Sequence, residues 1–371
     1  MLRLAVGEAM DLKSLLRQPR GHAIQARVYA EDPARDFRPG TGKLTRVEWP
    51  AGPRCDHWIR AGTEVTPHYD PLLGKIMVHA ESREAARQAM LAALEVTEIS
   101  GVETNLAYLS AIVGSEVFAK GETVTATLKT LTCPVHAVEV LDAGTFTTVQ
   151  SWPGRLGYWN VGVPPGGPMD ALSFRLANRL LGNPDTAAGL EMTMRGATLK
   201  FHRDAVGADM GATLDGAPVA HAVPVKVAAG QVLAMGAIKG AGCRAYLAVA
   251  GGIQVPDYLG STATFTLGGF GGHGGRTLQP GDMLRLAEGD TPSVPDTNGS
   301  ALLPALTDAW EIAVLYGPHG APDFFTPNDV EMIFSHEWKV HFNSARTGVR
   351  LIGPRPEWAR ADGGEAGLHP S

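Results

Sequence analysis

The residues best suited to chemistry in this chain stand among glycines. The run Gly268-Gly-Phe-Gly-Gly-His-Gly-Gly-Arg276 places a proton donor, His273, and a fixed cation, Arg276, in a backbone with few Cβ atoms. Such a backbone can bring its N–H groups close to a ligand. The alternative is a tightly turning loop with an exposed histidine, and the local sequence favours neither interpretation.

The same run also satisfies the pattern G-x-G-x-x-G over residues 269–274. A dinucleotide site needs a strand before that pattern, a helix after it and an acidic residue about 20 positions later. Here the turn Pro280-Gly-Asp282 follows in place of a helix. This context argues against a dinucleotide site.

A second segment with chemical potential runs from Ser151 to Asp170 and is rich in glycine and proline. Arg155 could contact a ligand there, and Asp170 stands where a helix should begin, a place that attracts anions. The alternative is a structural loop in which Asp170 only caps the helix. That alternative is strong for Asp170, because aspartate is a preferred N-cap, and weaker for Arg155.

The C-terminal third carries scattered histidines whose spacing disfavours a metal site. They are His319, His336, His341 and His369. Four arginines near glycines could build a cradle for a carboxylate or phosphate, or equally a solvated rim. They are Arg346, Arg350, Arg355 and Arg360.

One further cation stands near the N-terminus. Arg27 follows Ala26 in an apolar strand pattern and precedes the acidic pair Glu31-Asp32. It either pairs with those carboxylates structurally or stabilises an anion during chemistry. Taken alone, the sequence favours the structural pair.

These side chains need elements to position them. Apolar patterns predict strands over residues 23–30 and 72–79. Ser82 is the expected N-cap of a helix that reaches Val96, and a shorter helix is expected over residues 106–113. Asp170 should begin a helix over residues 171–181, which Gly182-Asn-Pro184 ends.

The rest of the chain has a different pattern. Residues 1–135 hold 10 glycines and the remaining 236 residues hold 35, which predicts a domain change within the polar segment 120–134. The second part should consist of short strands in a barrel-like architecture with a helical insertion. The predicted strands are 138–141, 244–250, 283–286, 311–315, 338–342 and 349–352.

Composition excludes several classes of protein. With 32 Lys and Arg against 38 Asp and Glu, the net charge of −6 argues against a nucleic-acid partner. No stretch approaches 18 uninterrupted apolar residues, so no membrane span is expected. Three widely spaced cysteines favour reduced thiols and a cytoplasmic setting. They are Cys55, Cys133 and Cys243.

Four motifs in residues 1–120 resemble the C-terminal subdomain of biotin carboxylases. They are 21–33, 39–43, 68–76 and 101–105. After a linker over 121–137, residues 138–371 resemble the carboxyltransferase region of urea carboxylases, a module also found in allophanate hydrolase subunit 2 and in the C subunit of 5-oxoprolinase. Its motifs are 153–159, 167–170, 265–275, 316–319 and 343–350.

The resemblance implies an α+β fold. A biotin carboxylase C-terminal subdomain should be followed by a mainly β, cyclophilin-like barrel that is incomplete. The family carboxylates biotin with ATP and bicarbonate, and then passes the carboxyl group to urea to give allophanate.

The resemblance also assigns roles to residues. Arg27 matches the arginine that stabilises the biotin anion, a catalytic role that reverses the structural interpretation above, although Gln25 replaces a common glutamate. Supporting roles fall on Asp70, Lys75 and Asp170. Carboxybiotin and urea should be bound by Arg155, His273, Arg276, His319 and Arg346. No general base is assignable.

Two protein segments that this reaction requires are not matched in this sequence. The ATP-grasp portion, which holds ATP and Mg²⁺, and the Met-Lys-Met site of a biotin carrier domain are not found. The chain is therefore expected to be an internal fragment that needs those portions as partners and does not complete the reaction alone. The alternatives are a C-type subunit of a 5-oxoprolinase and a non-catalytic binding module.

Overall fold

The computed structural model describes residues 2–8, 11, 13–14, 18–124, 126–131, 136–202, 205–208, 212–287, 307, 309–317, 319–342, 344, 346 and 348–360. Cys133, His369 and the segment 361–371 lie outside the described residues. Cys55 and Cys243 carry free thiols. Among the described residues, no helix is long and apolar enough to cross a membrane.

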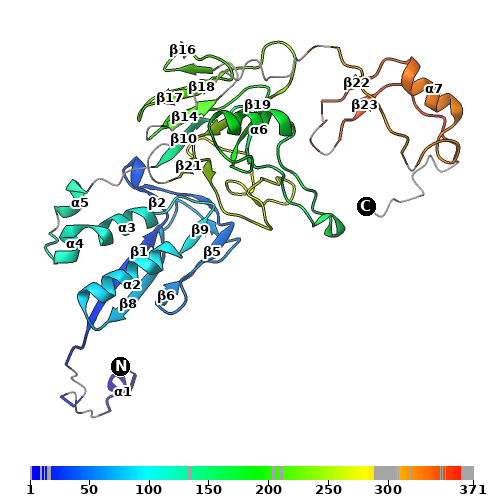
Figure 1. Ribbon diagram of the computed structural model, residues 1–371. Coiled ribbons are helices and arrows are strands. Elements are labelled where there is room, and N and C mark those ends of the chain that lie inside the picture. The colour runs from blue at the N-terminus through cyan, green and yellow to red at the C-terminus, as the bar shows by residue number, and fades with distance from the viewer. Residues whose placement is uncertain are drawn as a thin grey trace.

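The N-terminal unit is an antiparallel sheet covered by helices on one face (Figure 1). Its strand order is β1 (His22–Tyr29), β8 (Leu72–Ala80) and β6 (Arg54–His57). The helices are α2 (Arg83–Glu95), α3 (Leu106–Gly114), α4 (Glu116–Lys120) and α5 (Thr127–Thr130), and α1 (Leu2–Ala5) lies near the N-terminus. Alternate residues of β1 enter the core with the apolar face of α2, which leaves the other sheet face exposed.

Three short strand pairs and a 3-10 turn complete this unit. They are β2 (Glu31–Asp32) with β3 (Arg38–Pro39), β4 (Gly42–Lys43) with β7 (Glu64–Val65), β5 (Arg46–Glu48) with β9 (Glu98–Ser100), and η1 (Pro33–Arg35). The predicted strands and helices of this unit are confirmed to within one residue, and the Ser82 side chain caps α2 by accepting from the Ala85 N–H.

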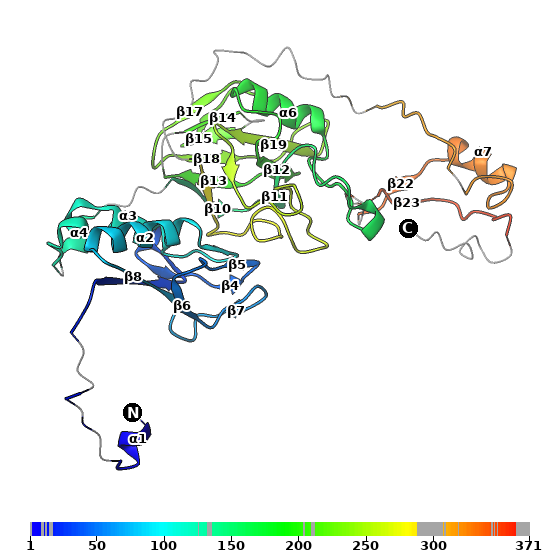
Figure 2. The same cartoon turned by 60° about the horizontal axis from the view of Figure 1, so that its bottom comes forward.

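The C-terminal unit contains two antiparallel sheets that share one core (Figure 2). The first has the order β16 (Ala217–Pro218), β15 (Ala212–Leu214), β18 (Val232–Met235), β13 (Thr198–Phe201), β10 (Ala137–Asp142), β21 (Met283–Leu286) and β20 (Ile253–Gln254). The second has the order β11 (Phe146–Gln150), β12 (Gly189–Thr193), β19 (Arg244–Val249), β14 (Ala205–Ala208) and β17 (Val225–Val227). No closed barrel is found among the described strands, so only the sheet-rich character of the prediction is confirmed.

Helix α6 (Ala171–Leu180) packs on β19 and β12, and the loop before it contains the turn η2 (Trp159–Val161). Both views show a further segment apart from the sheets, with α7 (Pro327–Ser335) and the pair β22 (Lys339–Val340) and β23 (Leu351–Ile352). The strand predicted over residues 311–315 is wrong. The apolar side chains of this segment are exposed and are not packed in a core; Leu315, for example, is 97% exposed.

Candidate functional site

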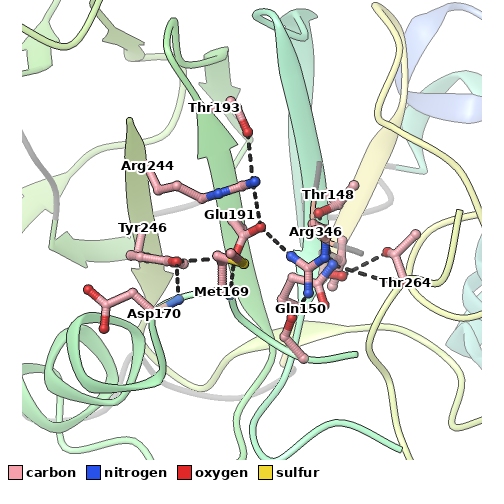
Figure 3. Close-up of polar contacts among 12 residues, drawn as sticks. Thr148, Gln150, Met169, Asp170, Glu191, Thr193, Arg244, Tyr246, Thr264 and Arg346 are labelled. Atoms are coloured by element: carbon pink, nitrogen blue, oxygen red, sulfur yellow. Dashed lines mark hydrogen bonds and ion pairs between the residues drawn. The ribbon is translucent and has the colours of Figure 1, made fainter. Parts of the chain in front are cut away.

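A row of polar side chains crosses the second sheet on the face away from the core (Figure 3). Thr148 of β11, Glu191 of β12 and Tyr246 of β19 are direct cross-strand partners. Because side chains alternate along a strand, their neighbours Val149, Leu190 and Leu247 enter the core. The loop before α6 covers this polar face, which buries all three side chains.

Glu191 is the centre of the site. Its side chain is 1% exposed. One carboxylate oxygen accepts from the Met169 N–H at 2.6 Å and from the Tyr246 hydroxyl at 3.1 Å, and the other accepts from Arg244 Nη1 at 2.8 Å and from Arg346. Burying a carboxylate is costly unless its oxygens find such partners. The site is therefore centred on a buried carboxylate that lies between two arginines.

Tyr246 connects this carboxylate to α6. Burial, together with the nearby Glu191 charge, raises the pKa of the Tyr246 phenol, which stays protonated and can donate to Glu191. The phenol oxygen also accepts from the Asp170 N–H at 2.7 Å. The start of the helix is thereby fixed to the site.

Asp170 acts as the N-cap, as the sequence alone favoured. Its Oδ1 accepts from the N–H groups of Leu172 and Ser173, both at 3.0 Å. The carboxylate is therefore occupied by the helix start, and only the backbone N–H of Asp170 faces the polar row.

Arg346 is the substrate-binding candidate that the structure brings to Glu191. It reaches the sheet from the segment that carries β22 and β23, and it also donates to the Gly167 carbonyl. Next to this pair, Gln150 Nε2 donates to Thr148 Oγ1 at 3.0 Å and to the Thr264 carbonyl at 3.4 Å.

Arg155 is buried in the protein interior, with 1% of its surface exposed. Its guanidinium donates to the backbone carbonyls of Tyr258, Ser261 and Ala263 and lies 4.9 Å from the Phe270 ring centre. Burial lowers the pKa of this guanidinium. In this arrangement Arg155 connects two loops.

The glycine run folds onto its own chain. The N–H of Gly272 donates to Thr262 and that of Gly275 donates to Gly271, both at 2.9 Å. A Cβ on Gly271 would overlap the Ala263 carbonyl oxygen. These contacts favour the tight-loop interpretation of the run.

His273 and Arg276 lie in a different cluster from Arg346. Arg276 makes a two-pronged ion pair with Asp282, both bonds at 2.8 Å, and His273 Nε2 lies 3.5 Å from the same carboxylate. They line a cavity of about 210 Å³ together with Asp32 and Arg35 of the N-terminal unit. The structure thus places them at the junction of the two units.

His319 lies in the outlying segment, where its ring packs edge-on against Phe324 at 4.5 Å. No contact between His319 and the Glu191 cluster is found in the described part of the chain.

Arg27 stands on the exposed face of the N-terminal sheet. It is the cross-strand partner of Lys75, which is in turn opposite Asp56. Within the described residues its guanidinium has no ion pair or hydrogen bond, so the pairing with Glu31-Asp32 is not found. Asp70 accepts from the Leu72 N–H at 2.8 Å and thereby shapes the loop before β8.

Sequence reasoning missed the centre of the site. Glu191 is a single acid between Leu190 and Met192, and this interruption of an apolar strand was the available signal. Gln150, Arg244 and Tyr246 carried no comparable signal. No group of three or more metal-binding side chains occurs among the described residues.

Comparisons with known proteins match both units. The family model described as carboxyltransferase domain, subdomain A and B, matches residues 161–371, and that of the biotin carboxylase C-terminal domain matches residues 25–130. The urea amidolyase of Lachancea kluyveri is 48% identical over the whole chain, which spans 21% of that protein.

Two further proteins are similar. The crystal structure of the Kluyveromyces lactis urea carboxylase superimposes with a TM-score of 0.88 at 43% identity, over 97% of this chain and 33% of that one. The C subunit of the Escherichia coli K12 5-oxoprolinase is 34% identical over 58% of this chain and 68% of its own length.

Proposed function

The chain belongs to the family of carboxyltransferase domains, subdomains A and B, and we propose that it serves a biotin-dependent urea carboxylase. It would contribute the end of the biotin carboxylase domain and the first part of the carboxyltransferase domain. The observation that carries this proposal is the presence of both domains in one chain, in the order found across a urea amidolyase relative that matches 100% of the chain.

Bound biotin would supply a ureido nitrogen that carries the carboxyl group between the two units. The N-terminal unit fits this group, because Arg27 and Lys75 are neighbouring cations on one exposed sheet face. A cation fixed there can stabilise the anion that develops on the ureido group. Asp56 lies opposite Lys75 and can hold that ammonium in place.

In the carboxyltransferase unit, the proposal places the reaction at the Glu191 cluster. Arg346 presents a guanidinium that suits a carboxylate or a urea oxygen. Glu191 and the Gly167 carbonyl hold that guanidinium in position, and the loop before α6 covers the polar row through the Met169 N–H.

The proposal includes further parts of a larger protein. ATP and Mg²⁺ would be bound by an ATP-grasp portion, and biotin would arrive on a carrier domain, within a cytoplasmic multidomain protein. The main alternative, the C subunit of a 5-oxoprolinase, leaves residues 25–130 without a role, because that relative matches only 58% of the chain. A non-catalytic binding module is the second alternative.

A hybrid protein tests the function. This chain replaces the aligned residues of the Lachancea kluyveri urea amidolyase, and product formation is measured with ATP, Mg²⁺ and bicarbonate. We expect urea-dependent formation of allophanate, reduced roughly 100-fold by Arg27→Ala and unchanged by Arg60→Ala, an exposed arginine.

Other outcomes would contradict the proposal. Turnover that requires 5-oxoproline and ignores urea would support the 5-oxoprolinase alternative. A folded hybrid that binds both compounds and converts neither would support the binding module.

A further inference from the structure

One buried polar atom beside Glu191 has no partner in the described part of the chain. The Gln150 side chain is 1% exposed, and its Nε2 is held by Thr148 Oγ1 and the Thr264 carbonyl. Its Oε1 accepts no hydrogen bond from a described residue. Leaving a buried acceptor unpaired costs about 1–3 kcal/mol, so the protein keeps this atom unpaired at a cost.

The orientation of the amide follows from its surroundings. If the two ends of the amide were exchanged, Oε1 would face the carbonyl oxygen of Thr264, and two acceptors repel each other. The Thr264 hydroxyl cannot relieve this, because it donates to the Val149 carbonyl at 2.7 Å. The free oxygen therefore points away from Thr264.

The free oxygen belongs to the same polar face as Glu191. Gln150 and Thr148 are two residues apart on β11, so their side chains leave the same face of the sheet. Thr148 is directly opposite Glu191, as Figure 3 shows. Two acceptors of this face, a Glu191 oxygen and the Gly167 carbonyl, are already occupied by Arg346. Gln150 Oε1 is an acceptor that remains for a ligand.

We propose that Gln150 is a specificity-determining residue whose Oε1 accepts an N–H hydrogen bond from the substrate. It would select an amide- or urea-type nitrogen, because a ligand with only acceptor atoms leaves the buried oxygen unpaired. This inference rests on the proposed function, since it names the group that recognises the substrate at the same site.

The first test compares Gln150→Met with Gln254→Met, which makes the same change at an exposed position of β20. In the hybrid protein, Gln150→Met should raise the KM for urea about tenfold, the equivalent of 1.4 kcal/mol. Gln254→Met should leave it unchanged. Bicarbonate-dependent ATP turnover without urea should be the same in both variants, which separates substrate recognition from misfolding.

The second test changes the ligand. Tetramethylurea keeps the urea carbonyl and has no N–H group, so the ratio of its dissociation constant to that of urea should fall about tenfold in Gln150→Met. Calorimetric titration of the 371-residue chain gives this ratio even if the hybrid is inactive. An active hybrid in which neither the ratio nor the KM changes overturns the role of Gln150. An inactive hybrid with the expected ratio overturns the proposed function alone.

Discussion

Glu191 shows how single residues organise this molecule. This carboxylate is 1% exposed, and its two oxygens accept hydrogen bonds from Arg244, Arg346, a phenol and a backbone N–H. Arg346 was predictable from the sequence as a binding residue, whereas Glu191, the acid that holds it, was not. A cation next to glycines is a local signal of a binding residue. The role of a buried acid within an apolar strand can be inferred only when its cross-strand partners are known.

Removing the Glu191 charge should therefore be costly. Glu191→Gln leaves two partly buried guanidinium groups without their anion, and we expect the free energy of unfolding to fall by about 3 kcal/mol. Chemical denaturation followed by circular dichroism measures the change. Glu81→Gln, at an exposed position, should change it by less than about 0.5 kcal/mol. An equally small effect of Glu191→Gln would show that Glu191 does not hold the arginines.

Asp282 gives a prediction for pH. Burial alone would raise the pKa of its carboxyl group, but hydrogen bonds from Arg276 and His273 outweigh burial and lower it. A lowered carboxyl pKa stabilises the fold above the unfolded pKa, and that contribution is lost as the pH falls from about 4 through the folded pKa. Unfolding free energies measured between pH 7 and pH 2.5 should show this loss, and Asp282→Asn should show a smaller one. Identical pH profiles for Asp282→Asn and the unsubstituted chain would show that the Asp282 carboxyl group does not contribute this pH dependence.

At the scale of elements, the sequence predicted more of the fold than of the site. Helix caps, apolar periodicity and two-residue alternation are local signals, so α2, α6, β1 and β8 were anticipated closely. Helix α3 was also anticipated, although no side chain caps its start. Residues 311–315 had the right composition and formed no strand, because a strand also requires a partner that composition does not reveal. The role of the glycine run was ambiguous for the same reason. The atoms that lie next to each glycine are set by the tertiary structure and cannot be deduced from the local sequence.

The glycine run offers a matched pair of substitutions. Gly269 and Gly271 both have positive φ, 67° and 73°, but an added Cβ meets open space only at Gly269. Gly269→Ala should cost about 1 kcal/mol of stability from backbone strain. Gly271→Ala should cost more than about 3 kcal/mol, because its Cβ also overlaps the Ala263 carbonyl. Thermal unfolding measures both, and equal costs would show that this loop is not packed as described.

At the scale of the whole molecule, the two units are joined by charged side chains. Arg35 of the N-terminal unit pairs with Glu139 of β10, which also lies 3.0 Å from His202 Nε2. Arg285 of β21 lies 3.8 Å from Glu103. His273 and Arg276, expected to bind substrate, belong to this junction in the structure. Their position could not be predicted from sequence, because the junction brings together residues far apart in the chain.

This junction should couple the unfolding of the two units. Glu139→Gln removes the anion shared by Arg35 and His202, so the N-terminal unit should unfold about 5 °C earlier than it does in the unsubstituted chain. Differential scanning calorimetry should show two separated transitions for this variant. The control Glu122→Gln, at an exposed position just after α4, should leave the trace unchanged. Coincident transitions in both variants would show that charge does not couple the units.

The pairing of Glu191 with Arg346 also sets an order of events during synthesis. The two residues are 155 positions apart in the chain, and ribosomes add about 5–20 residues each second. For on the order of ten seconds the nascent protein carries Glu191 and Arg244 before Arg346 has been made. The polar row is therefore completed only after the strands of both sheets have been synthesised.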